Sequence, residues 1–106
     1  MIPKIFRTFI SDLIAATENG KVKWRELDSS TFSCDHKNHT LHLSSYFDED
    51  RAVSMIFFRF VTDEKVTPFS VRDDEDGTDY QVMTQLLQVV AANANDVSTD
   101  IENFFD

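Results

Sequence analysis

The sequence predicts an α+β domain over residues 1–106: an N-terminal helix, an antiparallel meander of about five strands and a C-terminal helix. Apolar residues recur every three or four positions at the start, alternate with polar residues through the middle, and return to helical spacing near residue 80. The length of 106 residues suits a single domain, and 10 Phe supply its core. Both helices are expected on one face of the sheet.

The first helix is predicted from an apolar stripe at residues 2–14. Pro3 suits its first turn, and Gly20 suits its end because glycine readily adopts the left-handed conformation found there. Charged residues interrupt the stripe, so the segment is predicted to be neither a signal peptide nor a membrane span.

The strands are predicted from period-2 alternation, which places successive side chains on opposite faces of a sheet. Polar turns, including DEDR at 48–51, separate the alternating stretches. Five stretches are expected to form the strands: KVKWREL (21–27), TFSCD (31–35), TLHLSSYF (40–47), AVSMIFFRFVT (52–62) and PFSVR (68–72).

The C-terminal helix is predicted from helical spacing that begins at Tyr80. The pattern lapses near 93–96, where the helix is expected to break. Val97, Ile101, Phe104 and Phe105 then predict a final turn or short helix.

Charge is distributed unevenly along the chain. The net charge is −9; residues 1–44 hold five acids and six bases, whereas residues 45–106 hold fourteen acids and four bases. No Lys or Arg occurs from Asp73 to Asp106. The electric field of these charges repels nucleic acid and anionic membranes and attracts cationic surfaces. Direct binding to nucleic acid or to a membrane is therefore not expected. A single cysteine excludes an internal disulfide framework, and a cytoplasmic location is expected.

The acidic segment RDDEDGTDY (72–80) invites comparison with the EF-hand calcium loop. When Gly77 is aligned with the invariant glycine, Arg72 falls on the first ligand position and Met83 on the twelfth, which excludes that motif. Instead, we expect Gly77 to turn the chain and Asp76 or Thr78 to cap the following helix. The neighbouring carboxylates would then lie at the positive end of the helix dipole.

The segment CDHKNHTLH holds four zinc-ligand side chains, Cys34, His36, His39 and His42. A hairpin turning about Lys37-Asn38 would pair residues whose numbers sum to 75. His42 would then point away from the other three, and Cys34 would be buried among apolar neighbours. No metal, cofactor or catalytic residue is therefore expected, and the chain also lacks a glycine-rich phosphate loop and a G-x-S-x-G motif.

The strand at 52–61 is apolar on both faces. One face should pack against the helices. The C-terminal segment, with Phe104 and Phe105, is expected to cover the other; the alternative is a partner or a second copy, which would make a homodimer.

The segment ATENGKVKW resembles a loose group of small, uncharacterised bacterial and phage α+β proteins. The resemblance implies no activity and suggests a phage or mobile-element setting. It rests on a T-x-x-G-K-(I/V)-x-W pattern after the first helix and on a Tyr that opens the last helix: Thr17, Gly20, Lys21, Val22, Trp24 and Tyr80.

These features predict a small, acidic, non-catalytic binding protein that engages a basic protein surface, such as an immunity protein or a phage-encoded inhibitor of a host defence complex. One alternative is a metal-binding or redox module built on Cys34 and the histidines. Another is a subunit domain whose acidity only serves solubility. The candidate partner-binding residues are Asp73, Asp74, Glu75, Asp76, Asp79, Asp96 and Asp100, with Tyr80 as an aromatic anchor.

Overall fold

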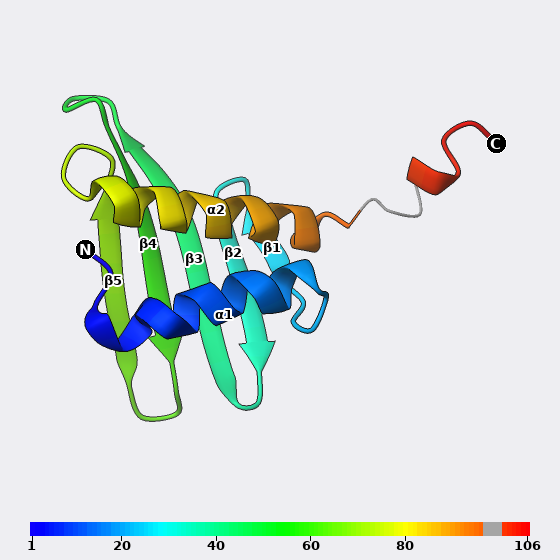
Figure 1. Cartoon of the computed structure of the whole chain (residues 1–106), viewed down its shortest axis with the longest axis horizontal. Coiled ribbons are helices and arrows are strands. Elements are labelled where there is room, and N and C mark those ends of the chain that lie inside the picture. Colours follow the sequence, from blue (N-terminus) through cyan, green and yellow to red (C-terminus); the bar gives the residue numbers. More distant parts are fainter. Residues whose placement is uncertain (97–100) are drawn as a thin grey trace.

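The computed structural model describes residues 1–96 and 101–106. It confirms the predicted α+β architecture: a five-stranded antiparallel sheet in the order β1-β2-β3-β4-β5, with both helices on one face (Figure 1). The elements are η1 (Lys4–Phe6), α1 (Arg7–Glu18), β1 (Arg25–Asp28), β2 (Thr31–His36), β3 (His39–Asp48), β4 (Val53–Val61), β5 (Val66–Arg72) and α2 (Gly77–Ala94).

Gly20 ends α1, as predicted. It adopts φ 72°, and its N–H donates to the carbonyl of Thr17 at 3.2 Å. The next N–H, of Lys21, donates to the carbonyl of Ala16 at 2.9 Å. These two bonds form a Schellman motif, which satisfies carbonyls that the helix leaves unpaired.

The β2–β3 hairpin has the predicted register. Lys37 and Asn38 both have positive φ, 51° and 66°, as a two-residue turn between twisted strands requires. Cys34 consequently pairs with Leu41, and His36 pairs with His39. Both pairs have numbers that sum to 75.

Strand β1 begins later than predicted, at Arg25 instead of residue 21. The preceding residues bond to α2: the N–H of Trp24 donates to Asn93 Oδ1 at 2.7 Å, and the Lys23 ammonium donates to the Asn93 carbonyl. Because α2 engages these backbone and side-chain groups, they do not extend the sheet.

The core lies between the sheet and the two helices. Trp24 is buried at its β1 side, where Nε1 donates to Thr17 Oγ1 at 3.1 Å. Aromatic rings fill the β5 side, with the Phe58 and Phe69 centroids 5.2 Å apart. The buried apolar residues that form this core cluster are Ile2, Phe6, Ile10, Leu13, Ile14, Trp24, Phe32, Cys34, Leu41, Leu43, Ile56, Phe58, Val71, Met83, Leu86 and Val90.

No helix of the described chain lies over the second face of the sheet (Figure 1). Helix α2 ends at Ala94, within the predicted break. The expectation that Phe104 and Phe105 cover this face is wrong: they are 75% and 93% exposed, and their segment lies beyond the β1 side of the sheet (Figure 1). Val97 and Asp100 lie outside the described residues. None of the helices in the described chain combines the length and the apolar character that a membrane-spanning helix needs.

Both sheet edges are poor templates for an added strand. On β5, Pro68 has no N–H, and the N–H of Arg72 donates to Asp76 Oδ2 at 2.8 Å. Strand β1 is only four residues long, is exposed throughout, and has an irregular register between Glu26 and Asp28. A partner would therefore have to use a face or side chains instead of edge pairing.

Candidate protein-binding surface

Arg72 organises the predicted acidic loop. Its guanidinium binds Asp74 through two hydrogen bonds, Nε to Oδ1 at 3.0 Å and Nη2 to Oδ2 at 2.8 Å. Its Nη1 also lies 3.2 Å from Glu75 Oε1. Hydrogen bonding to Asp74 raises the pKa of Arg72 further above its usual value. Two of the predicted partner-binding carboxylates are thus already ion-paired within the chain.

Asp76 occupies the position before α2, but the prediction that Asp76 or Thr78 caps the helix is wrong, since no side-chain cap hydrogen bond is present. The Asp76 carboxylate turns back instead, accepting the Arg72 N–H and lying 2.8 Å from the amino group of Met1. Its pKa is lowered chiefly by that amino group and then by the Arg72 N–H.

Asp79, in the first turn of α2, joins this helix to the N-terminal segment. Arg7 donates to its two carboxylate oxygens at 2.9 and 3.0 Å, and the N–H of Ile2 donates at 2.9 Å. The hydrogen bonds from Arg7 are the main reason that the pKa of Asp79 is lowered. The position also suits the positive end of the helix dipole. Asp79 therefore acts as a link between the two helices.

The β3–β4 turn places a second cluster of acidic residues beside the acidic loop at residues 73–76. The N–H of Asp73 donates to the carbonyl of Ser54 at 3.0 Å, so the β5–α2 loop starts next to the first residues of β4. The turn itself holds Asp48, Glu49 and Asp50, and it projects past the helices at the same end of the sheet (Figure 1). We call residues 48–50 and 73–76 together the acidic end.

Three side-chain carboxylates of the acidic end form no ion pair among the described residues. Asp48 accepts the N–H groups of Asp50 and Arg51, which shapes the turn. Glu49, Asp50 and Asp73 are exposed, and in the described part of the chain none of the three side chains forms an ion pair. Their negative charges therefore stay exposed to solvent.

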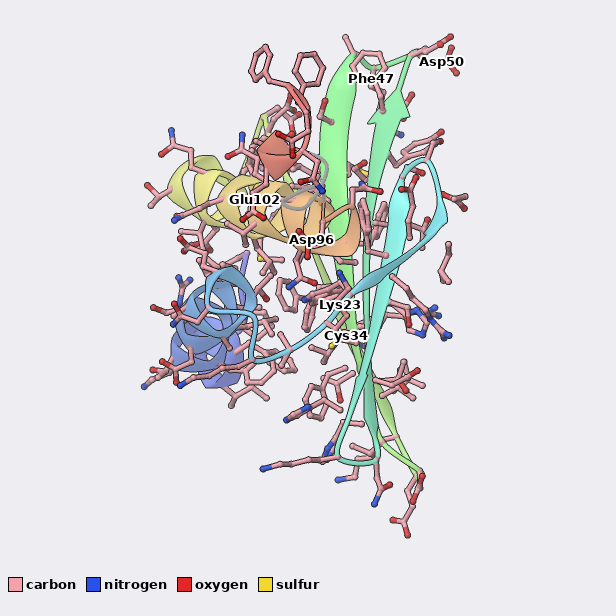
Figure 2. All side chains as sticks on the ribbon, turned by 90° about the vertical axis from the view of Figure 1, so that its right-hand side faces the viewer. Lys23, Cys34, Phe47, Asp50, Asp96 and Glu102 are labelled. Carbon is pink, nitrogen blue, oxygen red and sulfur yellow. The ribbon has the colours of Figure 1, made fainter. Side chains whose placement is uncertain are left out.

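An aromatic groove of about 450 Å³ lies next to the acidic end, between α2 and the β3–β4 hairpin. Phe47 is 54% exposed on the helix side of β3, where it pairs with Ser54, and it lies near the tip of the hairpin with Asp50 (Figure 2). Tyr46 is 56% exposed and also contributes to the lining, but as the preceding residue of β3 it presents its ring to the other face of the sheet. Exposed aromatic side chains beside free charges are common at protein interfaces. The groove is lined by Ser30, Ser45, Tyr46, Phe47, Ser54, Met55, Ile56, Tyr80, Thr84 and Leu87.

The predicted partner-binding residues do not form one surface. Residues 73–76, Asp79 and Tyr80 gather at the acidic end, and Tyr80 lines the aromatic groove. Asp96 lies beyond the other end of α2, about 27 Å along a helix of 18 residues, where it lines a hollow with Lys23 (Figure 2). Asp100 falls outside the described residues.

Sequence reasoning treated DEDR only as a turn and missed the aromatic pair before it. The signal was present in YFDED (46–50), which combines two aromatic residues with three acids. Its position next to Asp73 depends on the β3–β4–β5 pairing, which was open until the strand order was known.

The Cys34 region agrees with the predicted geometry. Cys34 is 1% exposed, and burial raises the pKa of its thiol. His42 points to the opposite face of the sheet, paired with Ser33 and Arg59. Within residues 1–96 and 101–106, no three His, Cys, Asp or Glu side chains are placed to hold a metal ion.

Comparisons with protein-family models, curated proteins and solved structures find no match.

Proposed function

We propose that this protein is a small, non-catalytic binding protein whose acidic end engages a basic protein surface. The observation that carries the proposal is the combination of free carboxylates at Glu49, Asp50 and Asp73 with the exposed ring of Phe47 at the groove. The exposed ring of Tyr46 lies on the other face of the same strand. Charges at the rim of an interface speed encounter, whereas a few buried aromatic anchors supply most of the affinity.

The chemistry of the partner follows from this division of roles. A partner that complements the surface carries Lys or Arg side chains around an apolar projection that enters the groove beside Tyr80. Nuclease toxins and host defence complexes present such basic surfaces to the phosphates of nucleic acid. An immunity protein or a phage-encoded inhibitor would offer carboxylates in their place.

The first test is a comparative capture experiment from the native host. Wild-type protein is compared with a variant carrying Glu49→Gln, Asp50→Asn and Asp73→Asn. The control variant also loses three negative charges, but at exposed positions away from the acidic end: Asp12→Asn, Asp63→Asn and Glu64→Gln. We expect one basic protein to be retained by wild type and by the control but not by the first variant.

The captured protein then allows a kinetic measurement. Neutralising the acidic end should slow association at low salt by about ten-fold or more, and this slowing should shrink at 0.15 M salt, where the screening length is ~8 Å. The dissociation rate should change less, because rim charges act mainly on encounter. Equal association rates for both variants, or an acidic captured partner, would contradict the proposal.

A further inference from the structure

The open face of the sheet, which no helix of the described chain covers, carries a row of basic side chains on a protein of net charge −9. Three basic side chains lie in one row that crosses all five strands, because consecutive strand pairings align them. That row is Arg25, Ser33, His42, Arg59 and Pro68.

The charges of this row act on one another. The pKa of His42 is lowered first by burial and then by the positive charge of Arg59, with a smaller opposing effect from Asp35. Arg25 lies 3.5 Å from Asp35, whereas Arg59 is exposed and forms no ion pair in the described chain. A carboxylate placed over this row would therefore meet an uncompensated arginine.

A hollow of about 460 Å³ adjoins the row. Its floor includes Phe57, 38% exposed, with hydroxyl side chains on the neighbouring strands. Beside it, Ser33 Oγ is fully buried without a hydrogen-bond partner among the described residues. The hollow therefore offers an aromatic ring, hydroxyl groups and a cation to an occupant. It is lined by Thr31, His42, Ser44, Phe57, Phe58, Arg59, Pro68, Phe69 and Ser70.

The segment Ile101–Asp106 has the complementary chemistry. Phe104 and Phe105 contact each other edge to face, with centroids 4.8 Å apart, yet they are 75% and 93% exposed. Glu102 and Asp106 flank them with negative charge. Glu102 lies on the helix side of its own sheet, opposite the hollow (Figure 2). A second copy is thus the nearest match for these side chains.

We propose that the protein forms a reciprocal homodimer in which the 101–106 segment of each copy docks on the open face of the other. Phe104 and Phe105 cover Phe57 in the hollow, and Glu102 or Asp106 pairs with Arg59. Each buried Phe removes roughly 150–250 Å² from water, so the four rings of a dimer account for about 600–1,000 Å². With the surfaces they cover, this reaches the range of a small specific interface. The acidic end stays free in such a dimer.

The test is a charge exchange between the two contact partners. Arg59→Glu removes the cation from the open face, and Glu102→Lys with Asp106→Lys makes the segment basic. Each variant alone should dimerise at least about ten-fold more weakly than wild type in sedimentation velocity. An equimolar mixture should recover the wild-type Kd within a few-fold, because both interfaces of the mixed dimer then join opposite charges.

Two controls separate this contact from general effects. Lys4→Glu makes the same change in net charge on the exposed start of η1 and should leave the Kd unchanged. Phe104→Ser with Phe105→Ser should abolish dimerisation. A wild-type protein that stays monomeric at the highest concentrations, a Lys4→Glu effect equal to that of Arg59→Glu, or folded variants whose mixture does not recover would each overturn the proposal.

Discussion

Phe58 and Phe57 are adjacent in the sequence but lie on opposite faces of β4. We therefore expect their replacement by alanine to lower the free energy of unfolding by very different amounts. Phe58 is 0% exposed, and its ring centroid lies 5.9 Å from that of Phe6 and 5.2 Å from that of Phe69. Phe57 is 38% exposed on the open face. We therefore expect Phe58→Ala to remove core packing and Phe57→Ala to remove little.

The magnitude follows from the buried area. A fully buried Phe removes roughly 150–250 Å² from water, which is worth ~4–6 kcal/mol at ~25 cal/mol/Å². Alanine retains part of this area but leaves a cavity, so Phe58→Ala should lower the free energy of unfolding by ~3–5 kcal/mol. A domain of this size is stable by only ~5–15 kcal/mol, so the loss is a large fraction of the total. For Phe57→Ala we expect a loss below ~1.5 kcal/mol.

Urea unfolding, followed by the fluorescence of the buried Trp24 and by circular dichroism, measures both variants. The protein concentration must be low enough for the chain to be monomeric, because dimerisation would add to the stability. An unchanged m-value would show that the same surface unfolds in each variant. Equal losses, or a larger loss for Phe57→Ala, would refute the assignment of Phe58 to the helix-covered face.

Two further outcomes test the N-terminal link and the buried thiol. Asp79→Asn should lower the free energy of unfolding by ~1–2 kcal/mol at neutral pH, because the charge-assisted hydrogen bonds from Arg7 are weakened. Since the folded pKa of Asp79 is lowered, its contribution is complete above the ordinary Asp value of ~3.9 and is lost as pH falls through the folded pKa. The difference from wild type should therefore shrink in acid; a constant difference would contradict this role. Cys34 should react with a thiol reagent on the order of 10³-fold more slowly in the native protein than in denaturant, and equal rates would contradict its burial.

Local chemistry was enough to predict much of the fold. Gly20 ends α1 because few other residues tolerate its φ of 72°, a property of one position. The register of the β2–β3 hairpin follows from its two-residue turn, so the facing of Cys34 and His42 could be predicted before any strand order was known. The helix and strand periods likewise reflect which face of each element is buried.

The sequence predicted the acidic residues of the candidate site but not which of them stay free. Contacts between residues far apart in the sequence pair some of these carboxylates within the chain. Asp79 and Arg7 are 72 positions apart, and their ion pair removes one carboxylate from the free acidic surface. Arg72 similarly engages Asp74 and Glu75. Composition counts every carboxylate equally, whereas folding leaves Glu49, Asp50 and Asp73 without such partners in the described chain.

The sequence by itself determined the type and order of the elements and the two faces of each strand, because these depend on side-chain spacing and turn residues. Only the tertiary structure decided that β1 starts at Arg25, that YFDED lies beside Asp73, and that no described helix covers the second sheet face. The start of β1 depends on Asn93, 69 positions from Trp24. The spacing of residues within one segment carries no information about a contact with a residue that far along the chain. Such contacts determine which polar side chains stay exposed and unpaired.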